Sequence, residues 1–221
     1  LRVGHLREAL RRLPLFAVAA MVLAWVLSGP VQAQSPDGVA STSALSATIN
    51  VTTTNQEVDS DGDCSLQEAI FAANFDAAKA IDPTNLNGPK INTGCTAGSG
   101  ADTIVLQAGA VYQVSGIVQN LFSVAGLSAT PDITSTITIQ GNGARIELVG
   151  GLNLRAFVVN QEAFPEISHA VGNLSLQNLH VKGFKAKGGN GTDGGGGGLG
   201  AGGAVYVRNG VLTVENSTFE G

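Results

Sequence analysis

Charged and aromatic side chains are scarce in this chain. Only 13% of its 221 residues are charged and 5% are aromatic, whereas 30 are glycine. A composition poor in charge and rich in glycine suits extended, repetitive β-structure better than a bundle of amphipathic helices. The formal net charge is -5, and no basic patch contains interleaved aromatic residues, so we expect no binding to nucleic acid.

Long hydrophobic runs are also scarce, and the clearest one lies near the N-terminus. Four arginines fall within residues 2–12, an apolar run extends from Pro14 to Leu27, and Val31-Gln32-Ala33 fits a small-residue cleavage site. These features predict a secretory signal peptide over residues 1–33. The alternative is a membrane anchor, but the apolar run is shorter than the roughly 20 residues that span a bilayer. Without residues 1–33 the chain keeps 8 Lys and Arg and 16 Asp and Glu, a net charge of -8.

The rest of the chain divides by composition. Residues 34–47 are small and polar and predict a linker. Beyond Asp102, short apolar runs follow one another, each bounded by Gly, Asn or Asp; they are 103–106, 111–114, 137–139, 146–149, 157–159, 174–176, 204–207 and 211–214. Such runs predict strands, and no helical period occurs in this half. We therefore expect an all-β domain over residues 102–221.

This half is also self-similar. LSLQNLHVKGF (174–184) aligns with LTVENSTFEG (212–221), so that alternating apolar residues precede an Asn and then a Gly in both segments, and ITIQGNGARI (137–146) is a looser copy. The pattern predicts a β-solenoid, whose coils bury their faces against neighbouring coils. The pattern stops at residue 221 without a polar terminal cap, so we expect a solenoid truncated at its C-terminus, the N-terminal piece of a longer protein.

A glycine-rich segment, residues 187–203, interrupts the repeats and contains a formal G-x-G-x-x-G. A dinucleotide site needs a strand before this motif and a helix after it. Here a glycine run precedes it and the β-favouring AVYV (204–207) follows. We interpret the segment as a loop.

Residues 48–101 are expected to form an N-terminal cap around one helix. Ser65-Leu-Gln-Glu68 is a capping box, in which the Ser and Glu side chains each satisfy a backbone N–H of the first turn. Apolar residues then recur at helical spacing, which predicts a helix over about 65–80.

Three acids, Asp59, Asp61 and Asp63, stand just before this helix. An EF-hand loop needs Gly at its sixth position and Glu at its twelfth, whereas Cys64 and Glu68 occupy the sixth and tenth, so the EF-hand fails. Two interpretations stay open. In the first, the acids lie there because negative charge is favoured at the positive, N-terminal end of the helix dipole. In the second, Asp59, Asp61 and Asp63 form a less regular oxygen site for calcium.

The chain has two cysteines, Cys64 and Cys95. In an exported chain a single pair predicts a disulfide. The alternative is two free thiols, which are less common outside the cell.

The segment CSLQEAI (64–70), followed by AAN and later by GADTIVLQAGAVYQV (100–114), resembles the CSLREA-type N-terminal region of exported bacterial proteins. Gln67 stands where that family usually has Arg. Those proteins are similar to right-handed parallel β-helix proteins with a short capping helix. GGAVYV (202–207) and NSTFEG (216–221) resemble the GGA[IV] and FxxN repeats of polymorphic outer-membrane proteins. The resemblance implies export, a right-handed parallel β-helix with an N-terminal capping α-helix and, often, a cell-surface location.

The sequence shows no Ser-His-Asp or Cys-His constellation. Glycoside hydrolysis needs two carboxylates at a fixed separation. The candidate acids do not recur at matched repeat positions, so we predict no convergence among Asp102, Asp132, Glu147, Glu162, Glu166, Asp193, Glu215 and Glu220. The candidate bases Lys182, Lys185 and Arg208, and the isolated His169 and His180, also form no pattern.

We therefore predict a secreted or cell-surface module with a binding or structural, adhesin-like role and no catalytic residues. Its partner would be a carbohydrate or a host or cell-surface ligand. We expect no cofactor, and calcium at Asp59, Asp61 and Asp63 stays the open alternative. Contact with a membrane would occur only through an anchor beyond residue 221. The alternative is the N-terminal part of a polysaccharide lyase or glycoside hydrolase.

Overall fold

Parallel strand pairing dominates the protein, whose computed structural model describes residues 45–117, 126–160, 171–190 and 198–221. The predicted signal peptide and most of the predicted linker lie outside these residues, as does part of the glycine-rich segment. All described residues belong to one unit, Thr42–Gly221.

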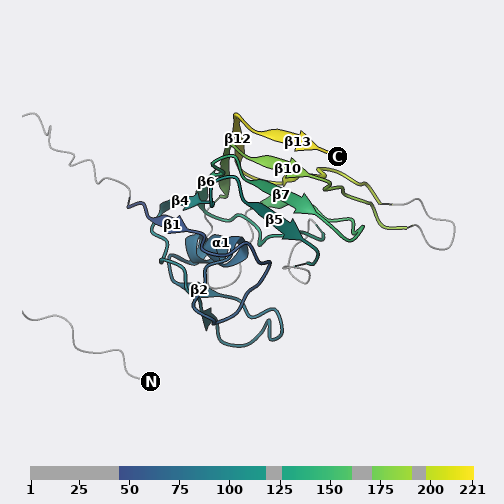
Figure 1. Ribbon diagram of the computed structural model, residues 1–221. Coiled ribbons are helices and arrows are strands. Elements are labelled where there is room, and N and C mark those ends of the chain that lie inside the picture. The colour runs from purple at the N-terminus through teal and green to yellow at the C-terminus, as the bar shows by residue number, and fades with distance from the viewer. Residues whose placement is uncertain (1–44, 118–125, 161–170, 191–197) are drawn as a thin grey trace, which may run out of the picture. The chain divides into compact units, whose positions relative to one another are not determined.

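Two parallel sheets hold most of the strands (Figure 1). The five-stranded sheet has the order β1 (Thr48–Asn50), β4 (Ala101–Val105), β6 (Thr136–Gln140), β9 (Asn173–Gln177) and β12 (Val211–Glu215). The four-stranded sheet has the order β13 (Thr218–Glu220), β10 (His180–Lys182), β7 (Arg145–Leu148) and β5 (Val111–Val114). In Figure 1 the arrows of β5, β7, β10 and β13 run side by side.

Four short strands form two small pairs. β8 (Phe157–Val159) and β11 (Val205–Val207) are parallel. β2 (Lys79–Ala80) and β3 (Ile91–Asn92) are antiparallel. The predicted strands therefore exist, and β1 lies in residues 48–53, whose β-branched side chains also predict a strand. β2, β3, β10 and β13 were not among the predicted runs.

The predicted fold class, an all-β right-handed parallel β-helix, is wrong. The described strands divide among separate sheets of five, four, two and two strands, and one of these sheets is antiparallel. Helix α1 (Leu66–Phe75) buries eight of its ten residues, so it is part of the core. The described part of the chain is therefore a mixed arrangement of parallel sheets with one helix, not a single solenoid. Alternating apolar residues predict strands and their pairing, but they do not predict how strands are shared among sheets.

Helix α1 begins as the capping box predicts. The Ser65 hydroxyl accepts from the Glu68 N–H at 3.1 Å, and the Glu68 carboxylate accepts from the Ser65 N–H at 2.9 Å. The helix ends at Phe75, five residues before the predicted end. Asp76 adopts a left-handed conformation with φ 48° and donates its N–H to the Ala72 carbonyl, which stops the helix.

The predicted repeat alignment is confirmed by the strand register. Leu174 pairs with Leu212 and Leu176 pairs with Val214. The looser copy also aligns, because Ile139 pairs with Leu176.

The strand register aligns similar apolar side chains in rows that cross the sheet inside the fold. Ile104, Ile139 and Leu176 follow one another across the five-stranded sheet and are all fully buried. Leu66 and Ile70 of α1 belong to the same core cluster. Burying one such side chain stabilises the fold by roughly 1.5–3 kcal/mol, so each member of these rows contributes to the stability of the fold.

The predicted disulfide is confirmed. Cys64 is bonded to Cys95, with their Cα atoms 4.7 Å apart and 31 residues apart in sequence. Both residues are buried. The bond ties the segment before α1 to the loop after β3. Within the described residues, no helix combines the length and apolar character that crossing a membrane requires.

Replacing both cysteines (Cys64→Ala with Cys95→Ala) should lower the free energy of unfolding by roughly 3 kcal/mol, because the bridge restricts the unfolded chain. Urea denaturation of both proteins at equilibrium measures the difference. A reductant should lower the midpoint of the wild type and leave that of the double variant unchanged. Equal midpoints for the two proteins without reductant would show that the bridge does not stabilise the fold.

Candidate functional site

Three asparagines occupy equivalent turns between the two large sheets. Asn142, Asn178 and Asn216 follow β6, β9 and β12 and have φ values of 51°, 51° and 46°. Asn tolerates this left-handed conformation better than most residues. The sequence alignment of Asn178 with Asn216 therefore predicted the turn correctly.

Neighbouring turns approach each other closely. A Cβ atom at Gly141 would lie 2.5 Å from the carbonyl oxygen of Asn178, so only glycine fits there. The Asn142 side chain donates from Nδ2 to the Leu106 carbonyl at 3.0 Å. These contacts tie the turn that holds Asn142 to the chain at Leu106 on one side and to the turn of Asn178 on the other.

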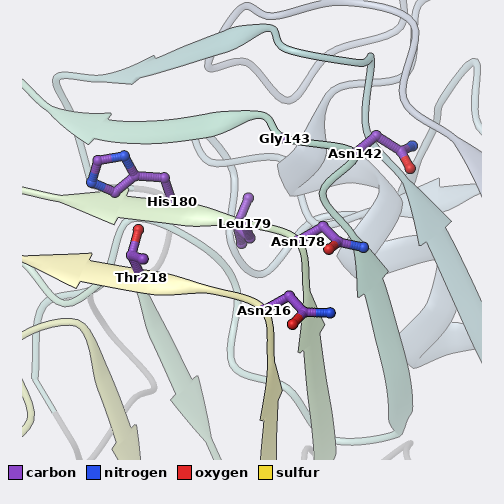
Figure 2. Close-up of a pocket in the computed structure, with 7 residues that line it drawn as sticks. All are labelled: Asn142, Gly143, Asn178, Leu179, His180, Asn216 and Thr218. Atoms are coloured by element: carbon purple, nitrogen blue, oxygen red, sulfur yellow. The ribbon is translucent and has the colours of Figure 1, made fainter.

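A surface groove of about 330 Å³ lies along these turns (Figure 2). We call it the corner groove; its lining residues are Asn142, Gly143, Asn178, Leu179, His180, Asn216 and Thr218. Figure 2 shows the three Asn side chains pointing to one side, while His180 and Thr218 lie on the strands that follow the turns. Amide, imidazole and hydroxyl groups offer both donors and acceptors, and the lining of the groove includes no carboxylate.

Ionisable side chains lie on the outer face of the four-stranded sheet, next to the corner groove. We call these side chains the charged face; they are Arg145, Glu147, His180, Lys182 and Glu220. The Glu220 carboxylate lies 3.2 Å from Lys182 Nζ and 3.4 Å from His180 Nε2, and Arg145 Nε lies 3.4 Å from Glu147. Surface ion pairs of this kind contribute little to stability.

The expectation that no candidate acids converge is wrong for one pair. Lys182 is paired with Glu147 on one side and with Glu220 on the other, so the two acids lie in one row of one sheet. The looser copy 137–146 ends one residue before Glu147, and its turn is two residues longer than the turn of 174–184, so the repeat pattern did not place Glu147 beside Lys182. His180 and Lys182 lie in neighbouring rows of the same sheet, so the same strand register would have predicted their positions.

The other candidates are scattered among the described residues. Asp102 and Asp132 are buried, and Glu215 lies on the five-stranded sheet. Arg208 Nη1 donates to Asn160 at 3.4 Å. The predictions for His169, Glu162, Glu166 and Asp193 fall outside the described residues.

The segment before α1, which we call the acidic segment, carries Glu57, Asp59, Asp61 and Asp63. It can hold a cation, but with acids that differ from the predicted set of Asp59, Asp61 and Asp63. Within the described residues, carboxylate oxygens of Glu57, Asp59 and Asp61 lie within 4.8 Å of one another, and Asp63 is not in this group. Such oxygen ligands suit a hard cation such as calcium. Glu57 could have been found, because it precedes Asp59 at the same alternate spacing.

The acids of this segment also hold its backbone. Asp59 accepts from the Asp61 N–H at 3.0 Å, and Asp61 accepts from the Asp63 N–H at 2.9 Å. Burial raises the pKa of Glu57, and repulsion from Asp61, Asp59 and Asp63 adds to the rise.

Glu68 joins this segment to the helix. Its side chain is fully buried and accepts from the Asp59 N–H at 3.0 Å as well as from Ser65. Burial raises the pKa of Glu68, and the bonds from the Ser65 and Asp59 backbone oppose the rise. The sequence predicted the contact with Ser65 and missed the one with Asp59.

No protein-family model, curated protein or solved structure matches this chain. The groove, the charged face and the acidic segment are therefore interpreted from their own chemistry.

The raised pKa of Glu68 predicts a pH dependence of stability. Over the pH range between the ordinary Glu pKa of 4.5 and the raised folded value, the folded chain keeps a proton that the unfolded chain has lost. The stability that this group contributes therefore falls as the pH rises through that range.

Glu68→Gln should remove this contribution and keep the capping box, in which Gln also serves. Urea denaturation between about pH 4 and about pH 7 should show the wild type losing stability relative to Glu68→Gln as the pH rises. Glu57 is common to both proteins, so its own titration cancels in the difference. A difference that moves in favour of the wild type with rising pH would contradict the assignment.

Proposed function

We propose that this chain is a binding module of an exported protein and that it holds a glycan in the corner groove. The observation that carries the proposal is the line of three asparagine amides at equivalent turns, beside His180 and Thr218. The role is adhesin-like: the module attaches to a glycan and does not transform it.

Export is supported by two independent features. Residues 1–33 have the basic, apolar and small-residue order of a signal peptide. The Cys64–Cys95 disulfide fits an oxidising compartment. A location at the cell surface or outer membrane belongs to the proposal, as does membership of the CSLREA-type exported proteins that residues 64–70 resemble.

The chemistry of the groove suits sugar hydroxyls. The Asn178 and Asn216 amides can donate from nitrogen and accept at oxygen, and the Thr218 hydroxyl can do both. The Asn142 nitrogen already donates to the Leu106 carbonyl, and its oxygen can accept. A volume of about 330 Å³ falls at the small end of the range of ligand pockets. The groove therefore matches one or a few sugar residues better than it matches a folded protein.

A second candidate function, a glycan-cleaving enzyme, is favoured by the row of Glu147, Lys182 and Glu220. Two strand spacings separate the two acids, about 10 Å, which approaches the separation in inverting glycosidases. Each acid, however, is engaged by a cation, and neither lines the groove. Binding is therefore proposed first.

The variant Asn178→Gly tests the groove. Glycine adopts the left-handed turn without strain, so the change removes the amide and keeps the backbone. We expect affinity for the bound sugar to fall about 5- to 10-fold, the effect of one or two lost hydrogen bonds. Isothermal titration with hexasaccharides of glucose, xylose, N-acetylglucosamine and galacturonic acid measures this affinity.

Asp76→Gly is the matched control, because it removes another left-handed side chain at the end of α1. It should leave binding unchanged. If none of the hexasaccharides binds the wild type, or if Asn178→Gly binds as tightly as the wild type, the groove is not the glycan site. New reducing ends that appear with the wild type and vanish in Glu147→Gln or Glu220→Gln would establish the enzyme instead.

A further inference from the structure

A row of hydroxyl side chains crosses the five-stranded sheet. Register pairs Thr48 with Thr103, Thr103 with Thr138, Thr138 with Ser175 and Ser175 with Thr213. We call these five residues the hydroxyl row. Every strand of the sheet contributes one member, and strands lie about 4.8 Å apart, so the row is roughly 19 Å long.

The hydroxyl row faces away from the core. Its members alternate along their strands with buried residues such as Ile104, Ile139 and Leu176. Thr48 and Thr213 are exposed and the other three are half-buried. Within the described part of the chain, none of the five hydroxyls makes a hydrogen bond to another protein group. They are therefore available to a ligand.

Amide side chains border the row on the side of the turns. Gln140 pairs with Gln177, and Gln177 pairs with Glu215, two residues further along each strand. The Gln177 side chain donates to Glu215 at 3.2 Å. On the other side, Asn173 donates to the Thr136 hydroxyl at 3.3 Å. On β9 a short hydroxyl thus lies between two longer amides, whereas the same positions are Ala101 and Val105 on β4 and Val211 and Glu215 on β12.

The two large sheets differ sharply in charge. Among the outward side chains of β1, β4, β6, β9 and β12, only Glu215 is ionisable, and it lies on the last strand. The four-stranded sheet carries the charged face. An uncharged, regularly spaced row of donors and acceptors complements an uncharged ligand and gives an ionic ligand no counter-charge.

We infer that the hydroxyl row binds an uncharged, linear polysaccharide that lies across the strands. Such a chain repeats hydroxyl groups along its length, and the length of one sugar residue is comparable to the strand spacing. Several weak hydrogen bonds made in register would add up along the chain. The inference rests on the proposed function only in taking the chain to bind glycans; the surface and the class of glycan are new.

The double variant Thr138→Val with Ser175→Ala tests the row, because it removes two central hydroxyls at nearly constant volume. Electrophoresis through gels that contain barley β-glucan, xylan, amylose or polygalacturonate measures affinity as retardation. We expect a neutral polymer to retard the wild type and the double variant to bind it about tenfold more weakly. Retardation should persist in about 0.5 M NaCl, because no ion pair is involved.

Thr54→Val is the control, since Thr54 is exposed and lies outside the row, and it should behave as the wild type. Thermal melting verifies that each variant folds. Retardation that survives the double variant, is lost in high salt, or is specific to polygalacturonate would overturn the inference.

The tests also separate the two proposals. Hexasaccharide binding that Asn178→Gly weakens, without retardation by any neutral polymer, would leave the corner groove in place and remove the hydroxyl row. Polymer retardation that the double variant weakens and Asn178→Gly leaves unchanged, without binding of any hexasaccharide, would support the hydroxyl row and remove the corner groove.

Discussion

In-register parallel pairing is the constraint on which the rest of this structure depends. Each strand of the five-stranded sheet places its residues directly beside their equivalents on the next strand. A shift by one residue would turn every apolar side chain outward. The same register that builds buried rows from Ile104, Ile139 and Leu176 therefore also builds polar rows on the outer surface, so core and surface are specified together.

The turns and the helix maintain this register. Asn178 and Asn216 adopt a left-handed conformation directly after β9 and β12, Asn142 does so one residue later after β6, and Gly141 lets one turn approach the next. Helix α1 fills the core with side chains that the strands do not supply. Glu68 fixes the start of that helix to the acidic segment, and the disulfide fixes the segment to the chain beyond β3.

The sequence predicted local features better than their assembly. Alternating apolar residues and repeated asparagines predicted the pairing of β9 with β12, and the capping box predicted where α1 begins. Composition could not show that strands divide among several sheets or that α1 is buried, because both depend on tertiary packing. The row of Glu147, Lys182 and Glu220 was missed because the turn between β6 and β7 is two residues longer than the turn between β9 and β10, so the sequences of the two repeats do not align Glu147 with Lys182. Glu57 was missed because the acidic segment was judged by the EF-hand pattern.

The most direct test of this account is disulfide cross-linking between strands. In a parallel pair, directly opposite Cα atoms lie about 4.8 Å apart, which a disulfide can bridge, whereas an offset of two residues exceeds about 7 Å. After mild oxidation, mass spectrometry of Thr138→Cys paired with Ser175→Cys should show a bond between these positions. The pairs Thr138→Cys with Asn173→Cys and Thr138→Cys with Gln177→Cys should remain unlinked. Preferential bonding in either offset pair would contradict the register and, with it, both polar surfaces.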